Sequence, residues 1–268
     1  MPLVHDVVAS GAPEKWMLFL HGILGSAANW RTFAKQIVAE RPSWGAALVD
    51  LRLHGGSLEG FAPPDTVASA AADLLALDLP GPVRGVLGHS FGGKVALAYA
   101  RGRHDLEQLF VIDATPSARA EPPKGSDSTR HVVDLLTTLP PELPDRNAFV
   151  AWIEERGVSR PVAMWLAMNV RPITGTTRYA FRIDVARVRE MLEDYFRTDL
   201  WDVLEDPEGR TERHLVVGGR SPAVDDSDRE HALRCPRTTL DVVPDAGHWI
   251  HVDAPKALQE LVLGYLSR

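Results

Sequence analysis

The stretch Gly88-His89-Ser90-Phe91-Gly92 decides the fold. It is a G-x-S-x-G pattern that follows a strand-like apolar run, 83–87, and precedes a helix-like run, 94–103. A serine on a sharp strand-to-helix turn projects its hydroxyl from the edge of a sheet, and small flanking residues let the turn close. Free N–H groups at the start of the helix can stabilise a negatively charged oxygen. We therefore predict that Ser90 is a nucleophile rather than part of an ordinary glycine-rich turn.

Strand and helix patterns alternate along the first 113 residues. Short apolar runs predict buried strands at 16–20, 46–49, 83–87 and 109–112. Helical spacing recurs between them, at 29–40, 67–77 and 94–103. The alternation returns after residue 210, with strands at 214–217 and 239–243 and a helix at 255–266. This rhythm predicts an α/β fold with a mostly parallel sheet and helices on both faces.

The alternation stops between residues 117 and 210. Residues 117–130 are rich in Pro, Ser, Lys and Arg. Helix-like segments without clear strands follow at 131–139, 146–156, 161–169 and 185–204. We predict a discontinuous core, 1–116 and 211–268, that carries a helical cap or lid formed by 117–210.

Composition limits the partners and the compartment. The net charge of −7 argues against a nucleic-acid partner, because phosphate binding needs a basic surface. Cys235 is the single cysteine, so no intrachain disulfide can form, and we expect a structural role for it. No signal-peptide pattern occupies residues 1–9, and no apolar run approaches the roughly 20 residues that span a bilayer. We predict a cytoplasmic protein without a membrane span, and the oligomeric state stays open.

A serine nucleophile needs a base within hydrogen-bond reach. His248 lies in a loop between the last predicted strand and the final helix, at the carboxyl edge of the sheet where Ser90 also lies. His251 is the nearest alternative, with a helix-entry role as its competing interpretation. His21 and His89 flank glycines in strand-to-helix turns, and we interpret them as packing residues.

The acid that orients this base has two possible sources. Asp113 directly follows the apolar run 109–112, where a short carboxylate can reach a histidine. Asp225 and Asp226 follow a later strand, although both also resemble carboxylates at a helix N-terminus. We favour Asp113. Ser221 then becomes an auxiliary hydrogen-bond partner of the Asp–His pair, or a plain turn serine.

An oxyanion hole needs two backbone N–H groups aimed at one point. Phe91 supplies one, because it follows the nucleophile. Ile23, in the turn His21-Gly22-Ile23, can supply the other. Because no His, Cys and carboxylate set has the usual zinc spacing, we expect no metal and no organic cofactor.

Taken together, these motifs resemble the α/β-hydrolases. The motifs that carry the resemblance are His21-Gly22-Ile23-Leu24-Gly25-Ser26, Asp50-Leu51-Arg52-Leu53-His54-Gly55-Gly56-Ser57, Gly88-His89-Ser90-Phe91-Gly92-Gly93-Lys94 and Ala246-Gly247-His248-Trp249. The Gly92-Gly93-Lys94 continuation, Asp113 and the stretch Gly218-Gly219-Arg220-Ser221-Pro222 are similar to a narrower branch. That branch holds small bacterial acyl esterases and thioesterases and their mitochondrial abhydrolase relatives. In its esterases the acid follows the sixth strand and a serine takes the usual acid position after the seventh, which supports Asp113 and Ser221. The resemblance also implies that the cap follows the sixth strand.

The cap offers two hypotheses about the substrate. Met164, Trp165 and Met168 belong to an apolar run that could line an acyl pocket with Trp249, or could simply pack the cap onto the core. Seven arginines fall between residues 156 and 189, at positions 156, 160, 171, 178, 182, 187 and 189. They could bind an anionic group such as the phosphates of an acyl-CoA, or could pair with the acidic residues Glu190, Glu193 and Asp194.

We interpret the chain as a serine hydrolase that cleaves carboxylic esters or thioesters of short to medium acyl chains. Dehalogenases and epoxide hydrolases of this fold use an aspartate nucleophile, so Ser90 argues against both. Carbon–carbon bond hydrolases and cofactor-free haloperoxidases use the same serine and stay open as alternatives. A hydrolase-like small-molecule receptor also stays open, because such a receptor can retain all three residues.

Overall fold

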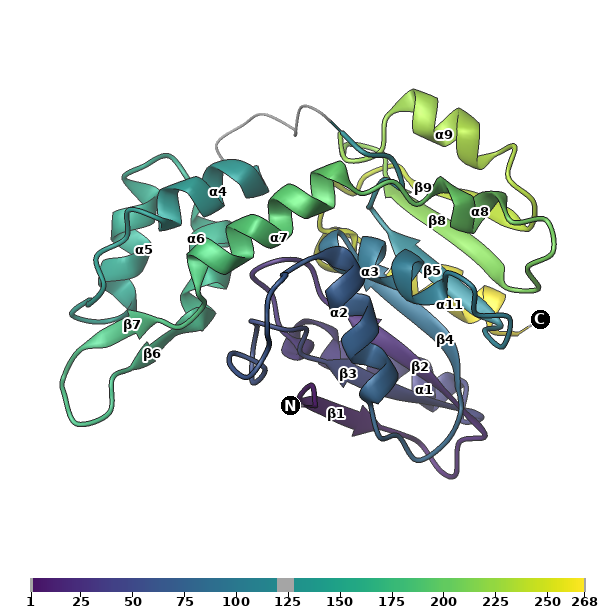
Figure 1. Ribbon diagram of the computed structural model, residues 1–268, viewed down its shortest axis with the longest axis horizontal. Helices are drawn as coiled ribbons and strands as arrows, with labels where there is room; N and C mark the ends of the chain where they lie inside the picture. Colours follow the sequence, from purple (N-terminus) through teal and green to yellow (C-terminus); the bar gives the residue numbers. More distant parts are fainter. Residues whose placement is uncertain (1, 120–127, 268) are drawn as a thin grey trace.

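A seven-stranded sheet forms the centre of the molecule in the computed structural model, which describes residues 2–119 and 128–267 (Figure 1). Its strands follow the order β1-β3-β2-β4-β5-β8-β9. Their bounds are β1 His5–Val8, β2 Lys15–Leu20, β3 Trp44–Val49, β4 Val83–His89, β5 Gln108–Ile112, β8 Glu212–Gly218 and β9 Thr238–Val243. Neighbouring strands are parallel except β1, which pairs with β3 in the antiparallel sense. The predicted mostly parallel α/β sheet is confirmed.

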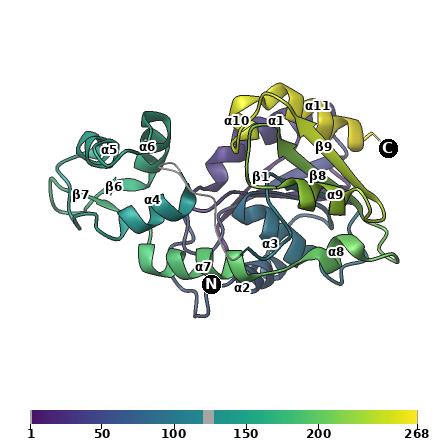
Figure 2. The same cartoon turned by 90° about the horizontal axis from the view of Figure 1, so that it is seen from above.

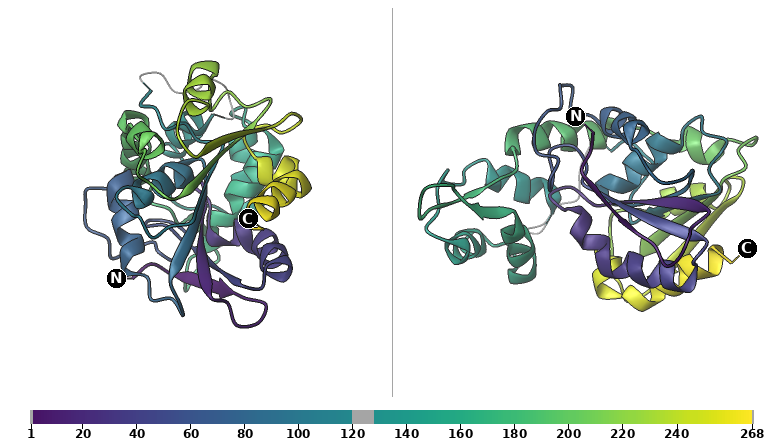
Figure 3. Two further views of the ribbon diagram at one scale, coloured as in Figure 1. Left: turned by 90° about the vertical axis from the view of Figure 1, so that its right-hand side faces the viewer. Right: turned by 90° about the horizontal axis from the view of Figure 1, so that it is seen from below.

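The central strands are apolar on both faces, as a parallel sheet covered by helices requires. In β2, Leu18 and Leu20 belong to one buried cluster, whereas Met17 and Phe19 belong to the other. Both clusters are completed by helices, so the sheet lies between two helical layers (Figures 2 and 3). The continuous apolar runs therefore arise because successive side chains must both be buried.

Helices cover both faces of the sheet. One layer contains α1 (Arg31–Glu40), α10 (Ile250–Asp253) and α11 (Pro255–Tyr265). The other contains α2 (Val67–Asp73), α3 (Phe91–Ala100), α8 (Trp201–Glu205) and α9 (Asp226–Ala232). Short 3-10 turns precede α1, at Ala27–Trp30, and follow α2, at Leu74–Ala76. Cys235 is buried in the second layer.

The segment between β5 and β8 extends beyond the sheet at the left of Figure 1. Its elements before α8 are α4 (Thr129–Leu136), α5 (Arg146–Glu154), α6 (Arg160–Leu166), a 3-10 turn (Ala167–Asn169), β6 (Val170–Pro172), β7 (Tyr179–Phe181) and α7 (Val185–Arg197). We call the part from α4 to α7 the cap. It follows β5, the fifth strand in chain order among the described residues, whereas the resemblance places the cap after the sixth strand of the family pattern. Part of the Pro- and Ser-rich connector, 120–127, lies outside the described residues.

Two features of this segment differ from the sequence prediction. The cap contains an antiparallel hairpin, β6–β7, because three-residue strands are too short to leave an alternating pattern. The helix predicted over 185–204 is two helices, with extended backbone at Thr198 separating α7 from α8. Helix α8 falls within the predicted cap, 117–210, yet it packs against α3 of the core. The cap boundaries 117–210 stay a prediction.

The short strand β1 was also absent from the prediction. It lies at the edge of the sheet and is partly exposed, so it shows no buried apolar run. Among residues 2–119 and 128–267, no helix has both the length and the apolar character needed to cross a bilayer. The cytoplasmic location stays a prediction.

A buried ion network joins the cap to the core. Arg187 on α7 donates from Nε and Nη2 to the two carboxylate oxygens of Asp65, at 2.6 and 2.8 Å. The Asp65 side chain is fully buried, and Arg52 also donates to it, at 3.2 Å. Burying a carboxylate is costly unless charged donors replace the lost water. Arg187 therefore holds the position of α7 by compensating a buried charge.

We predict that Arg187→Met destabilises the protein by about 2 to 4 kcal/mol, because Asp65 keeps a single cationic partner in a dry site. Chemical denaturation of both proteins measures the difference. Arg197→Met is the matched control: Arg197 is on the same helix, its side chain is 74% exposed, and its ion pair with Glu193 is at the surface. The control should change stability by less than about 0.5 kcal/mol. Equal effects of the two substitutions would contradict a structural role for Arg187.

Candidate active site

Ser90 lies on a sharp turn between β4 and α3. Its backbone has φ 55° and ψ −118°, a conformation that costs a residue with a side chain about 1–3 kcal/mol. The turn closes because the backbone atoms approach without side chains between them: a Cβ on Gly88 would lie 2.0 Å from the carbonyl oxygen of Gly92. A Cβ on Gly92 would lie 2.5 Å from the carbonyl oxygen of His21. The two glycines of the motif are therefore required by the close approach of the backbone.

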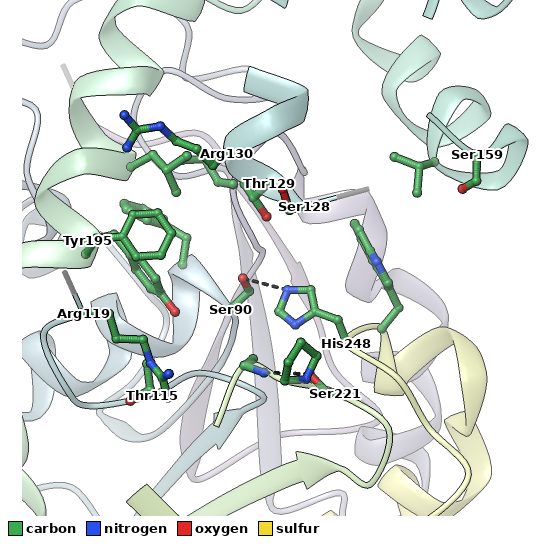
Figure 4. Close-up of a pocket in the computed structure, with 18 of the residues that line it drawn as sticks. Ser90, Thr115, Arg119, Ser128, Thr129, Arg130, Ser159, Tyr195, Ser221 and His248 are labelled. Atoms are coloured by element: carbon green, nitrogen blue, oxygen red, sulfur yellow. Dashed lines mark hydrogen bonds between the residues drawn. The ribbon is translucent and has the colours of Figure 1, made fainter. Parts of the chain in front are cut away.

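The structure brings Ser90, His248 and Asp113 together at the carboxyl ends of the strands. Figure 4 shows Ser90 and His248 with their hydrogen bond. Nε2 of His248 lies 3.0 Å from Oγ of Ser90, and Nδ1 lies 2.7 Å from Oδ2 of Asp113. A carboxylate at Nδ1 requires a proton on that nitrogen, so Nε2 is left to accept the proton of the serine hydroxyl. The arrangement is therefore suited to nucleophilic attack by Ser90 on a carbonyl carbon.

Asp113 is fully buried and accepts hydrogen bonds on both oxygens. The N–H of Gly218 donates to Oδ1 at 2.9 Å. The hydroxyl of Ser221 donates to Oδ2 at 2.5 Å, on the same oxygen that faces His248. These donors compensate the burial of the carboxylate and fix its orientation toward the histidine. Ser221 thus lies where the prediction of an auxiliary partner places it.

The alternative acids and base have other partners. Asp225 caps α9, where it accepts from the N–H of Asp228 at 2.9 Å, and Asp226 is the first residue of that helix. His251 is partly buried, and its ring lies 4.9 Å from the ring of Trp30. Burial lowers the pKa of His251 to about 4, so it is a neutral packing residue at pH 7. The local geometry favours Asp113 and His248.

His89 does more than pack the turn. Its Nε2–H donates to the backbone carbonyl of His248 at 2.7 Å, and the two rings lie 4.8 Å apart. Burial lowers the pKa of His89 well below its usual value, so the ring presents no positive charge to its neighbour. Because His89 adjoins Ser90 in the chain, it links the positions of Ser90 and His248.

The two proposed oxyanion donors lie at the same cavity. Ile23 and Phe91 both line it together with Ser90. Phe91 is the first residue of α3, so its N–H has no carbonyl partner within the helix. The loop that contains Ile23 is held in place by the motif at residues 50–57: the N–H of Leu24 donates to Nε2 of His54 at 2.9 Å. Asp50 adds a second brace by accepting from the N–H of Ala27 at 2.7 Å.

This bracing requires neutral histidines. Nε2 of His54 accepts from Leu24, and Nε2 of His21 accepts from the N–H of Leu51 at 3.0 Å. A nitrogen that accepts a hydrogen bond cannot carry a proton. Burial lowers the pKa of His21 to about 4 and that of His54 to about 3, which keeps both rings neutral at pH 7. The sequence prediction assigned no role to His54, although its motif was recognised.

Above Ser90 lies a cavity of about 610 Å³. The core supplies one wall, and α4, α6 and α7 of the cap supply the other (Figure 4). Its apolar residues include Val162, Leu192, Phe196 and Trp249. Arg119 and Arg130 also reach it, but Arg119 is held by Asp225 and Asp228, at 3.1 and 2.7 Å.

Two residues predicted for the pocket are not part of it. Met164 and Met168 are 52% and 48% exposed, and neither lines the described cavity. Helix α6 turns Val162 toward the cavity, so residues near it in sequence but on the opposite side of the helix point to solvent. Trp165 lines a narrow recess beside Ser90, where its ring lies 4.6 Å from the ring of Trp249.

The arginines at 156–189 do not converge on a phosphate site in the part of the chain that the structure describes. None of them lines the cavity. Five have carboxylate neighbours within 4.0 Å: Arg156, Arg160, Arg178, Arg187 and Arg189. Within the described ranges, no group of three or more His, Cys, Asp or Glu side chains could hold a metal ion.

A nucleophile turn on a parallel sheet, with a histidine and an aspartate at the same edge, is typical of esterase- and lipase-type hydrolases. The model of the α/β hydrolase family matches residues 17–261, and the chain belongs to this family.

The chain is similar to an sn-1-specific diacylglycerol lipase, ABHD11, of Danio rerio: 29% identity over 272 residues, 99% of this chain and 82% of the relative. It is 24% identical over 258 residues to Esterase YbfF of Escherichia coli K12, covering 94% and 92% of the two chains. A solved marine microorganism esterase has the same fold, with a TM-score of 0.81 at 21% identity over 98% of this chain and 99% of that one.

We predict that acid destabilises the protein from about pH 6.5 downward. Buried His21 and His54 have folded-state pKa values below the ordinary 6.5, so the unfolded chain binds protons first as the pH falls. Each should cost about 1.4 kcal/mol per pH unit until its folded pKa is reached. Thermal unfolding between pH 7.5 and 5 measures the loss.

His54→Gln keeps an acceptor for Leu24 without titrating, so its stability should fall less steeply in acid. His104→Gln is the control, because His104 is exposed, and it should match the unsubstituted protein. If His54→Gln loses stability between pH 7.5 and 5 as steeply as the unsubstituted protein, His54 is not held neutral in the fold.

Proposed function

We propose that the protein is a serine hydrolase that cleaves carboxylic esters or thioesters of short to medium acyl chains through an acyl-enzyme. One observation carries the proposal: the hydrogen-bonded series Ser90–His248–Asp113 meets a cavity of about 610 Å³ with several apolar walls. A volume in this range suits a small organic ligand. The family membership supports hydrolysis as the class of reaction.

In the proposed first step, Oγ of Ser90 attacks the carbonyl carbon while Nε2 of His248 takes the hydroxyl proton. The resulting imidazolium is stabilised by the Asp113 carboxylate 2.7 Å from Nδ1. The N–H groups of Ile23 and Phe91 stabilise the oxyanion of the tetrahedral intermediate. His248 then gives its proton to the departing alcohol or thiol, which leaves an acyl ester on Ser90.

The second step repeats the chemistry with water. His248, neutral again, takes a proton from a water molecule as the water attacks the acyl ester. Collapse of the second tetrahedral intermediate returns the proton to Oγ of Ser90 and releases the carboxylic acid. Ser221 contributes by holding Oδ2 of Asp113 through a 2.5 Å hydrogen bond, so the carboxylate keeps facing the histidine in both steps.

The acyl half is the part of the substrate that we propose the cavity selects. Val162, Leu192 and Phe196 provide apolar contact area for a hydrocarbon chain. The names of the relatives, a diacylglycerol lipase and an esterase, support an acyl ester. An acyl-CoA is compatible with the chemistry, but none of the seven arginines between residues 156 and 189 lines this cavity.

The first test is hydrolysis of p-nitrophenyl esters from acetate to decanoate. We expect saturable turnover, with kcat/KM rising with chain length until the cavity is filled and then falling. Ser90→Ala should lose at least about 10³-fold in kcat, because the nucleophile is gone. Turnover that persists in Ser90→Ala would contradict the proposal. No turnover by the unsubstituted protein would favour a carbon–carbon bond hydrolase or a receptor.

A second test identifies the acid. Asp113→Asn should lower kcat by roughly 10⁴-fold, because an amide cannot hold His248 in the required tautomer. Asp225→Asn is the control, since this residue caps α9 and pairs with Arg119. It should leave kcat within about threefold of the original. The opposite result would move the acid to the later loop.

A further inference from the structure

Lys94 has no role in the chemistry above, yet it is fully buried. It completes the Gly92-Gly93-Lys94 stretch and lies on α3, one helical turn beyond Ser90. Burying an ammonium group is costly unless each of its donors finds a partner. The hydrogen-bond partners of Nζ therefore indicate the role of Lys94.

All three partners of Lys94 are backbone carbonyl oxygens. Nζ donates to Ser117 at 2.8 Å, to Tyr195 at 2.6 Å and to Thr198 at 2.7 Å. It also lies 4.5 Å from the centre of the Tyr195 ring, within range of a cation–π interaction. An ammonium has three N–H donors, so this geometry uses all of them.

The three carbonyls belong to both connections between core and cap. Ser117 lies in the segment that leaves β5 for the cap. Tyr195 lies in the last turn of α7, and Thr198 follows that helix on the way back to the core (Figure 1). The last carbonyls of a helix have no partner within it and carry a partial negative charge, which favours a cation there. One side chain thus joins both connections to the helix that carries the nucleophile.

The end of α7 also forms part of the cavity. Leu192, Tyr195 and Phe196 line it, and the Tyr195 ring lies 6.1 Å from the ring of Phe91. A shift of this helix end would change the wall that faces the acyl chain. Ser90, Asp113 and His248 follow strands of the sheet, so their mutual distances do not depend on α7.

We propose that Lys94 is a positioning residue: its three hydrogen bonds hold the end of α7 against α3 and so set the shape of the acyl cavity above Ser90. The consequence for substrate choice rests on the proposed function. The consequence for the position of α7 does not.

The proposal has a pH dependence. Burial lowers the pKa of Lys94 to about 8, an effect that the nearby Asp199 opposes. The other charged or titratable groups that face it are Arg119, Asp194, Asp228 and Tyr195. When pH rises past about 8, the amine keeps two N–H donors for three carbonyls. One carbonyl then lacks a donor, and the end of α7 is held less firmly.

The first experiment compares p-nitrophenyl octanoate with the acetate. Lys94→Met removes the donors while keeping a long apolar side chain. We expect the octanoate-to-acetate ratio of kcat/KM to fall at least about tenfold, mostly through a higher KM for octanoate, because only the longer chain reaches the displaced wall. Lys35→Met is the control: Lys35 is exposed on α1 in the opposite helical layer and should leave the ratio unchanged. An unchanged ratio in Lys94→Met would overturn the proposal.

The second experiment needs no variant. In the unsubstituted protein the same ratio should fall between pH 7 and 9.5 with a midpoint near 8. Both esters are cleaved by the same proposed chemistry of Ser90 and His248. The pH dependence of that chemistry therefore cancels in the ratio of the two kcat/KM values. A ratio that is flat over this range would contradict the proposal.

Hydrogen–deuterium exchange tests the position of α7 without any activity. At one pH below 8, Lys94→Met should exchange faster over residues 192–198 than Lys35→Met does. Equal protection would overturn the proposal. If neither ester is hydrolysed by the unsubstituted protein, the proposed function fails and this exchange result still decides the role of Lys94. If Lys94→Met does not fold, exchange over 192–198 in the unsubstituted protein, corrected for intrinsic rates, should rise as the pH passes 8.

Discussion

The close approach of backbone atoms around Ser90 is the constraint on which the site depends. Gly88 meets Gly92 across the turn, and Gly92 in turn lies against the carbonyl of His21. The first contact places Ser90 at the start of α3. The second contact brings the loop of Ile23 to the same point. These two contacts together position the Ser90 hydroxyl and both proposed oxyanion donors. Any side chain at these glycines would separate the parts that the chemistry needs together.

Burial and hydrogen bonding determine which side chains around Ser90 carry a charge. Asp113 is a buried carboxylate whose oxygens accept from Gly218, Ser221 and His248. The surrounding histidines His21, His54 and His89 are kept neutral and act as acceptors or donors of fixed direction. Within the described ranges, the ring of His248 has one charged hydrogen-bond partner, the Asp113 carboxylate, and its other neighbours include the Ser90 hydroxyl and the rings of His89 and Trp249. This arrangement favours a proton on Nδ1 and keeps Nε2 available to Ser90.

Sequence reasoning predicted the parallel sheet and the residues that meet at its edge, because both follow from local patterns: apolar runs give strands, and the carboxyl ends of parallel strands are neighbours. It missed β1 and the hairpin β6–β7, whose short strands leave no periodicity. It also assigned Met164 and Met168 to the pocket, because helical spacing shows which residues share a stripe but not which stripe faces inward. The roles of Lys94 and Arg187 were hidden for another reason: their partners, the carbonyl of Tyr195 and the carboxylate of Asp65, are distant in sequence.

The place of Asp113 in the chain has an evolutionary consequence. β4 and β5 are hydrogen-bonded neighbours, with His89 opposite Ile112, so the residues that follow them, Ser90 and Asp113, have a spacing set by the ladder itself. Both precede the cap. An acid in the loop after β8 would instead be separated from the nucleophile by the whole inserted segment. Because Ser90 and Asp113 directly follow two adjacent strands and both precede the cap, insertions, deletions and drift in the cap can reshape the cavity while the spacing of these two residues is kept.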